Sequence, residues 1–261
     1  MIIPYWSYHT INFSHLVIQI WPFFSIIGLL AGFLLFLYLS YYKARIPYRL
    51  AIFCLGIFGL TGGLVGAKIG GIIFNSKDYP NYNYTWLDYL NLFQGPSFSL
   101  TGIIGLAVAG ILYIWYLNKY TDKKINFWQI ADITAFSVII FLIIFRIGCF
   151  LLNDHLGIEN NLSWGILWPD GTVRHPIILY LILGNIAILL WLAVFYKKFY
   201  SKSGQIFLIA LSFYAAFRFL ISFFQEEKKF LGLSVIQYFS LAFLLLMLTI
   251  SLFLYKIKKE V

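Results

Sequence analysis

Three basic side chains lie inside or at the end of long apolar runs, where a charge is costly. Lys68, Arg146 and Arg218 occupy these positions, and Asp132 is the one acidic residue within such a run. A charge at membrane depth costs at least about 2.5–3.5 kcal/mol on insertion scales, so such residues normally face a polar cavity and mark a functional site. These four residues are therefore the first candidates for chemistry.

The two arginines are suited to binding phosphate. A guanidinium keeps its charge at any pH that a protein meets and forms two parallel hydrogen bonds to a phosphate group. Arg146 is expected to close the fourth apolar run at its outer end, and Arg218 to lie about 9 Å below the outer end of the sixth, near Phe224. The pair could converge in the outer leaflet on an anionic phospholipid head group. Each could instead be a structural anchor that snorkels or pairs with an acid.

Seven apolar runs are long enough to cross about 30 Å of hydrocarbon, which takes roughly 20 helical residues. They are Ile18–Tyr41, Leu50–Phe74, Thr101–Leu117, Phe127–Phe145, Pro176–Tyr196, Gly204–Phe224 and Leu233–Tyr255. None shows the alternation of a membrane-spanning strand. The sequence therefore predicts an all-α polytopic membrane protein, with a single transmembrane domain over residues 1–261.

The composition of the 261 residues supports this reading and excludes a soluble protein. The chain is 61% hydrophobic, 21% aromatic and 11% charged, whereas soluble domains are about 25% charged. The net charge of +9 is explained by basic residues that flank the spans, so no nucleic acid partner is expected. Cys54 lies in an apolar run and a disulfide with Cys149 is not expected. No His/Cys cluster has metal-ligand spacing, so we expect no metal and no cofactor.

The loops between the spans predict the orientation in the membrane. Alternate loops hold twelve of the 19 basic residues: Lys43, Arg45, Arg49, Lys119, Lys123, Lys124, Lys197, Lys198, Lys202, Lys256, Lys258 and Lys259. The opposite loops hold four: Lys77, Arg174, Lys228 and Lys229. The positive-inside rule then places the C-terminus in the cytoplasm and the N-terminus outside. Met1–His15 has no Lys or Arg, so the first span is expected to be retained and not to be a signal peptide.

Two connections on the predicted outer side are much longer than the cytoplasmic ones. They cover residues 75–100 and 147–175 and are rich in Asn, Tyr, Trp, Gly and Pro. Connections of this length are usually functional or disordered, and the aromatic content argues against disorder. We expect a small periplasmic or extracellular cap formed by both.

The second apolar run carries a stripe of glycines at spacings of three and four residues. They are Gly59, Gly62, Gly63, Gly66, Gly70 and Gly71. Small residues at these spacings let membrane helices pack closely. The stripe is therefore interpreted as a packing surface and not as a ligand loop.

One stretch resembles a known signature. Residues 146–157 read R-I-G-C-F-L-L-N-D-H-L-G, which resembles the R-x-G-N/C-F-x-x-G-E/D-x-x-G pattern of the prolipoprotein diacylglyceryl transferase family. Further likenesses follow in order along the chain: Gly66-Ala67-Lys68, Asp132, Trp164-Gly165, Pro169-Asp170-Gly171, Arg174-His175-Pro176, Leu179-Tyr180, Arg218-Phe219 with Phe223-Phe224, and Gly232-Leu233-Ser234 with Gln237 and Ser240. The seven-span topology with an outer N-terminus is also that of the family.

The resemblance implies an enzyme of the bacterial plasma (inner) membrane. It would move the diacylglyceryl group of phosphatidylglycerol onto the lipobox cysteine of a prolipoprotein, as a thioether, and release glycerol phosphate. For this chemistry Arg146 and Arg218 are the catalytic candidates that would stabilise the departing phosphate, and His175 is a catalytic candidate as the base. The resemblance further implies that Arg146, Arg218, Asp154, Gly157, Tyr180, Asp132 and Lys68 bind the substrates. Fixed positive charge suits the departing phosphate, and a thiol with a pKa of about 8.5 needs help to ionise.

The chain departs from the family pattern at the residue that could supply this help. The family has an H-G-G stretch where Leu100 takes the place of the histidine, although Gly102 and Gly105 remain. Two acids of the pattern are replaced as well, by Leu181 and Ser222. Remaining candidates for the base are His175 and His155, with Asp154 behind them.

Each of these candidates has a structural interpretation too. His155 could be a solvated loop histidine, and His175 could make a structural hydrogen bond at the start of the fifth span. Asp154 is expected to pair with Arg146 and hold it in place.

Two other functions stay open. A divergent paralogue could keep the lipid-binding fold and act on another acceptor, or bind lipid without catalysis; the missing histidine and acids favour it. A small transporter or channel would show broken helices in paired halves, whereas the charges here gather toward the outer side.

Overall fold

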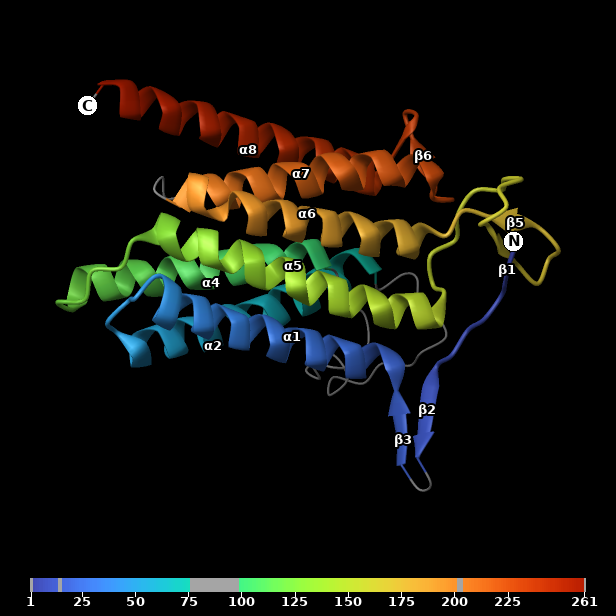
Figure 1. Cartoon of the computed structure of the whole chain (residues 1–261), viewed down its shortest axis with the longest axis horizontal. Coiled ribbons are helices and arrows are strands. Elements are labelled where there is room, and N and C mark those ends of the chain that lie inside the picture. The colour runs from blue at the N-terminus through green and yellow to red at the C-terminus, as the bar shows by residue number, and fades with distance from the viewer. Residues whose placement is uncertain (1, 14–15, 76–98, 201–203, 261) are drawn as a thin grey trace. The chain divides into compact units, whose positions relative to one another are not determined.

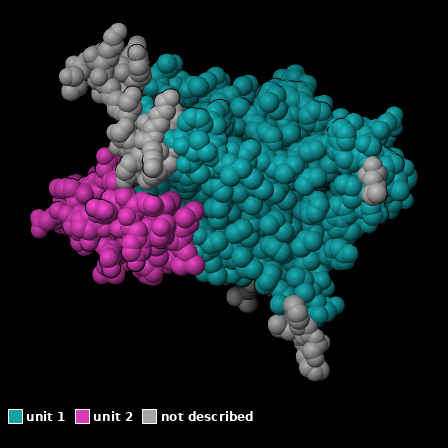
Figure 2. All heavy atoms as spheres, in the orientation of Figure 1, with its two compact units in different colours: residues 1–32, 131–261 teal, residues 33–130 magenta. Residues whose placement is uncertain are grey.

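The structure, a computed structural model, describes residues 2–13, 16–75, 99–200 and 204–260 (Figure 1). It divides into two compact units, coloured separately in Figure 2. Unit 1 comprises residues 1–32 and 131–261, and unit 2 comprises residues 33–130. Helices α1 (Ile20–Tyr38) and α5 (Phe127–Leu152) each supply residues to both units.

Seven helical stretches in the described ranges are long and apolar enough to cross a membrane. They are Ile20–Lys43, Arg49–Ile73, Thr101–Tyr120, Phe127–Leu152, Ile177–Phe195, Gln205–Phe224 and Val235–Phe253. The expectation of an all-α polytopic membrane protein is confirmed, and the ends lie close to the expected ones at six of the seven spans.

The fourth span differs from the expectation. Helix α5 continues to Leu152, so Arg146 does not close the span but lies six residues inside the helix. At 1.5 Å per residue, this places Arg146 about 9 Å from the helix end. The charge of Arg146 had suggested a boundary, but the apolar residues that follow it stay helical because their last carbonyls find partners.

Those partners come from the first residues of the chain. The backbone carbonyls of residues 150–152 accept hydrogen bonds from Trp6 Nε1 (2.8 Å), Tyr8 N–H (2.9 Å) and Ser7 Oγ (2.9 Å). A helix end leaves four carbonyls without partners inside the helix. The N-terminal segment therefore stabilises the last turn of α5.

Unit 1 holds the remaining long helices of the C-terminal half. Helix α7 (Gln205–Ile221) lies between α6 (Ile177–Tyr200) and α8 (Val235–Glu260) and contacts both (Figure 1). The 3₁₀ turn η4 (Ser222–Phe224) follows α7 directly. Within the same unit, α1 and α5 approach closely at Gly32, where a Cβ would lie 2.9 Å from the carbonyl oxygen of Ser137.

A small sheet covers the end of α5 in unit 1. Strands β1 (Ile3–Pro4), β4 (Ile166–Leu167) and β5 (Val173–Arg174) form it in that order, with β1 parallel and β5 antiparallel to β4. Two segments extend it beyond β5. Residues 156–160 bond to β5 and residues 224–226 bond to residues 156–160, for example from Ile158 N–H to Phe224 O (2.8 Å). We call the strands β1, β4 and β5 with these two segments the cap.

The cap differs in composition from the one expected. Residues 76–98, which form most of the first expected connection, lie outside the described residues. Residues 147–152 belong to α5, and only the later part of the second connection enters the cap. The N-terminal strand and residues 224–226 were not expected there. Their strands are too short to show an alternating pattern in the sequence.

Two further hairpins were not expected either. Strand β2 (Thr10–Phe13) pairs with β3 (Leu16–Gln19), and β6 (Lys229–Phe230) pairs with β7 (Leu233–Ser234). The turn between β6 and β7 holds Leu231 and Gly232 at positive φ (48° and 88°). Glycine adopts this conformation without strain.

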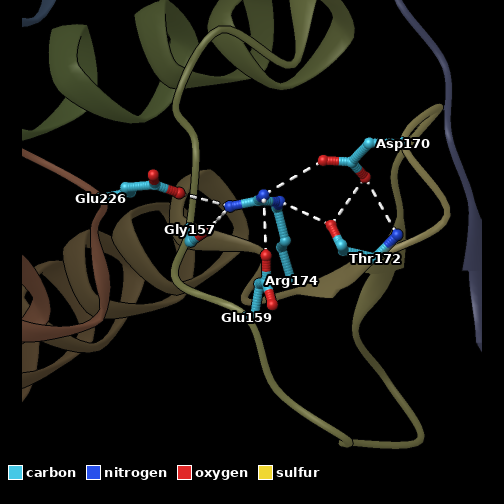
Figure 3. Close-up of polar contacts among 6 residues, drawn as sticks. All are labelled: Gly157, Glu159, Asp170, Thr172, Arg174 and Glu226. Atoms are coloured by element: carbon cyan, nitrogen blue, oxygen red, sulfur yellow. Dashed lines mark hydrogen bonds and ion pairs between the residues drawn. The ribbon is translucent and has the colours of Figure 1, made fainter.

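Arg174 joins the segments of the cap (Figure 3). Its side chain is 9% exposed and donates to Thr172 Oγ1 (2.8 Å), Asp170 Oδ2 (3.1 Å), Glu159 Oε1 (3.2 Å), the Gly157 carbonyl (3.3 Å) and Glu226 Oε2. A guanidinium has five N–H donors, and these bonds account for all five. Arg174 therefore connects residues 157–159, the β4–β5 hairpin and Glu226 by hydrogen bonds.

In unit 2, α2 (Arg49–Gly70) packs against α4 (Ser99–Tyr120) through the glycine stripe. A Cβ at Gly62 would lie 2.7 Å from the carbonyl oxygen of Gly105, and one at Gly66 would lie 3.0 Å from the Gly105 Cα. The interpretation of the stripe as a packing surface is confirmed. Short π-helical turns follow α1 and α2, namely η1 (Leu39–Lys43) and η2 (Gly71–Asn75).

Gly105→Leu should destabilise unit 2, because any side chain would push α2 and α4 apart. We expect a loss of about 1–3 kcal/mol, measured as a lower Tm of the protein in detergent. Gly110→Leu in the same helix is the matched control, since a Cβ there meets nothing within 4 Å. Equal Tm values for the two variants would contradict close packing at Gly105.

Arg174→Ala should loosen the cap, because five hydrogen bonds are lost at once. We expect a loss of about 1–3 kcal/mol in stability and faster amide hydrogen exchange in residues 156–160. Arg174→Lys should recover little of either, since one ammonium cannot reach three segments. Wild-type exchange in Arg174→Ala would show that the backbone bonds alone hold the cap.

Asp170 should make the stability of the hydrogen bonds around Arg174 sensitive to acid. Hydrogen bonds from the Thr172 hydroxyl and backbone N–H, and then from Arg174, lower the pKa of Asp170. A lowered folded pKa means that the carboxylate stabilises the fold above its unfolded pKa of about 3.9, and that this is lost as pH falls through the folded value. The Tm difference between wild type and Asp170→Asn should therefore be largest at pH 5 and shrink toward pH 3. A constant difference would contradict the assignment.

Candidate active site

Arg146 and Arg218 come from different helices of unit 1 and lie near one another. Arg146 is on α5 and Arg218 is on α7, and their guanidinium groups are close enough to repel each other electrostatically. Arg218 is only 6% exposed. Two like charges in a poorly hydrated place repel strongly, so the arrangement favours an anion that binds between them.

Arg218 is held by the turn that ends its own helix. Its Nη1 and Nη2 both donate to Gln225 Oε1, at 3.1 and 3.2 Å. Ser222, which is buried, returns a hydrogen bond from its hydroxyl to the Arg218 carbonyl (2.6 Å). Gln225 is neutral, so it positions the guanidinium and leaves its charge for a ligand.

Arg146 has a histidine as its partner. Its Nη1 lies 3.1 Å from His155 Nε2, and His155 Nδ1 bonds to Asp154 Oδ1. The expected direct pair between Asp154 and Arg146 is wrong, because His155 lies between them. The reason is the turn after α5, where Asn153 has a positive φ of 51° and starts the loop that returns His155 to Arg146. Asparagine tolerates this conformation better than most residues.

His175, Gly157 and Tyr180 meet at the start of α6. His175 Nδ1 bonds to the Tyr180 hydroxyl (3.1 Å), and the His175 ring lies 4.9 Å from that of Phe224. Burial lowers the pKa of His175, so this histidine is neutral at neutral pH. Gly157 lies against the His175 backbone, where a Cβ would collide. Gly157 thus permits the close approach of two cap segments.

Asp132 and Lys68 do not join Arg146 and Arg218 within unit 1. Asp132 is buried and accepts hydrogen bonds from the backbone N–H groups of Gly204 (2.7 Å) and Phe207 (2.8 Å). It therefore caps the first turn of α7. Fourteen residues of α5 separate it from Arg146, which is about 21 Å along the helix. Lys68 is buried in α2, in unit 2.

Glu227 and Gln225 were not singled out in the sequence. The Glu227 carboxylate attracts Arg218 electrostatically, and its Oε2 is buried without a hydrogen-bond partner among the described residues. The two acids that the family pattern has at Leu181 and Ser222 are absent, and both of these positions are buried. Glu227 restores one negative charge near Arg218. The sequence feature that could have indicated Glu227 is the acidic pair Glu226-Glu227, just after the sixth span.

Comparisons with known proteins show the family of the chain. Residues 9–254 match the family described as prolipoprotein diacylglyceryl transferase. Three similar proteins are all named phosphatidylglycerol–prolipoprotein diacylglyceryl transferase. That of Geobacter sulfurreducens is 32% identical over 68% of this chain and 66% of its own length. Those of Campylobacter hominis (31%; 66% and 61%) and Campylobacter lari (32%; 76% and 75%) are similar to the same degree.

The matched segment thus spans about two thirds of the length of the first two relatives. The family match covers nearly the whole chain, including the helices that carry both arginines and every segment of the cap except β1. The chain therefore belongs to the prolipoprotein diacylglyceryl transferase family.

Proposed function

We propose that this protein transfers the diacylglyceryl group of phosphatidylglycerol to the lipobox cysteine of prolipoproteins, in the bacterial plasma membrane. The single observation that carries the proposal is the pair Arg146 and Arg218, which two membrane helices hold near one another in a member of this family. The names of the relatives supply the lipid and the class of acceptor.

The chemistry asks for what the two arginines offer. The acceptor sulfur attacks the glyceryl carbon that carries the phosphate ester, and the carbon–oxygen bond breaks with its electron pair going to the phosphate. Negative charge therefore grows on the departing glycerol phosphate. Preorganised guanidinium groups stabilise such charge without reorganising, and do so best where water is scarce.

The surrounding residues support the arginines in different ways. Asp154 acts on Arg146 through His155, and Gln225 holds Arg218. Gly157 and Tyr180 shape the cap beside the site, next to His175. Lys68 stays a candidate for contact with the lipid, whereas the hydrogen bonds of Asp132 favour a structural role.

One observation favours the alternative of a divergent relative with another acceptor or without activity. The histidine of the family pattern is Leu100, which lies at the start of α4. A leucine cannot accept or donate a proton. If no other group ionises the thiol, the lipid site would serve a different reaction.

The assay uses the purified protein in detergent with phosphatidylglycerol and a lipobox peptide that has one cysteine. We expect the diacylglyceryl thioether by mass and glycerol phosphate in equal amount. Arg146→Ala and Arg218→Ala should each lower the rate by about 100-fold or more, as the loss of one preorganised donor does. Arg→Lys at either position should be nearly as poor, because the planar fork is lost.

Arg49→Ala is the matched control, since this exposed arginine lies in unit 2 at the start of α2. Its activity and Tm should equal those of the wild type, and all variants should remain folded in detergent. Full turnover by Arg218→Ala would refute the phosphate role of that residue. Neither product from the wild type, beside a working relative, would favour the alternative.

A further inference from the structure

His155 links the phosphate-binding arginine to a carboxylate. Its Nε2 lies 3.1 Å from Arg146 Nη1, and its Nδ1 bonds to Asp154 Oδ1. The side chain of His155 is 20% exposed and that of Asp154 is 37% exposed. The imidazole is thus held by two partners and is still open to a substrate.

The chemistry of the partners fixes the tautomer. A guanidinium has only donors, so Arg146 donates and His155 Nε2 accepts. The proton of the neutral imidazole then sits on Nδ1 and is donated to Asp154. A carboxylate behind Nδ1 orients the ring and stabilises the imidazolium that forms when Nε2 takes a proton. This is the arrangement of a general base.

The charged and titratable groups around His155 are compatible with its acting as a general base. Cys149 Sγ lies 4.0 Å from Arg146 Nη1, on α5. Arg218 on α7 is repelled electrostatically by Arg146 and attracted by Glu227, which follows η4. Arg146 and Arg218 balance Asp154 and Glu227 in charge, so the site gains net negative charge only when a phosphate binds. A base that gains positive charge there would lie next to the bound anion.

We infer that His155 is the base that takes the thiol proton of the acceptor cysteine, in place of the histidine that is Leu100 here. The inference rests on the proposed function. The S–H proton passes to Nε2 and the sulfur forms its bond to the glyceryl carbon. The carbon–oxygen bond breaks onto the phosphate, and the proton leaves His155 for the released glycerol phosphate or for water. Atoms and electrons balance without a further reactant.

Arg146 imposes an order on these steps. In the structure, the lone pair of Nε2 accepts a hydrogen bond from Arg146. A phosphodiester is a stronger acceptor for a guanidinium than a neutral imidazole is, because the bond is charge-assisted. When the lipid binds, Arg146 turns to the phosphate and Nε2 becomes free for the thiol. The base is therefore released only after phosphatidylglycerol is in place.

His175 is less suited to this task. Its Nδ1 bonds to the Tyr180 hydroxyl and its ring packs on Phe224. Neither partner carries charge that would stabilise an imidazolium, and burial lowers the pKa of His175. His155 has a carboxylate partner and direct contact with the arginine that binds the phosphate.

His155→Gln separates a base from a positioning residue. The glutamine oxygen can still accept a hydrogen bond from Arg146, but the amide cannot take a proton. We expect kcat to fall by about 100-fold or more, with the KM for phosphatidylglycerol changed less than threefold. His9→Gln is the matched control, because His9 is exposed and its side chain bonds only to the Ser7 hydroxyl among the described residues. It should behave as the wild type.

An acceptor that needs no base supplies the second readout. A lipobox peptide with selenocysteine in place of cysteine carries a selenol, which is ionised at neutral pH. With this peptide, His155→Gln should recover to within about threefold of the wild type. Equal loss with both peptides would make His155 a positioning residue, and near-wild-type rates with the cysteine peptide would remove it from the reaction. If the wild type modifies neither peptide, the proposed function itself fails, and the base fails with it.

Discussion

The five hydrogen bonds of Arg174 are the constraint on which the site depends. They join residues 157–159, the β4–β5 hairpin and Glu226, which come from three separate parts of the chain. Gln225, which holds Arg218, is the neighbour of Glu226, and His155 lies two residues before Gly157. One buried guanidinium thus fixes the loops that orient Arg146 and Arg218, and all five of its own N–H donors are used.

A site built from two arginines has to keep like charges close without a ligand. Gln225 helps because it accepts two hydrogen bonds from Arg218 without cancelling its charge. Glu227 and Asp154 supply negative charge at greater reach, one near Arg218 and one behind His155. Negative charge near Arg218 and His155 therefore comes from these two carboxylates, whereas Leu181 and Ser222 are buried and carry none.

The sequence predicted the spans and the glycine packing because both are properties of single helices. The apolar run length locates a span, and the spacing of Gly62 and Gly66 locates a helix contact. The predicted end of the fourth span is wrong because a charged residue such as Arg146 normally marks a span boundary, whereas here Trp6 and Tyr8 bond to the last carbonyls of α5 from far away in the chain. The Asp154–His155–Arg146 order was also missed, because it depends on the left-handed turn at Asn153. Hydrogen bonds between distant residues and the conformation of a single turn residue cannot be predicted from the hydrophobic or glycine spacing of the sequence.

The bonds between the first residues and α5 have a consequence for biogenesis. Trp6 and its partner Phe150 are 144 residues apart, and synthesis at about 5–20 residues per second needs roughly 7–30 s to cover that distance. Throughout this interval the N-terminal segment has been made but its partners have not. Residues 6–8 can bond to the last turn of α5 only when the first four spans have been made, and β1 can pair with β4 only after that. Glu226 arrives later still. The candidate site around Arg146 and Arg218 is therefore complete only after the sixth span has been made, because Gln225 and Glu226 follow that span.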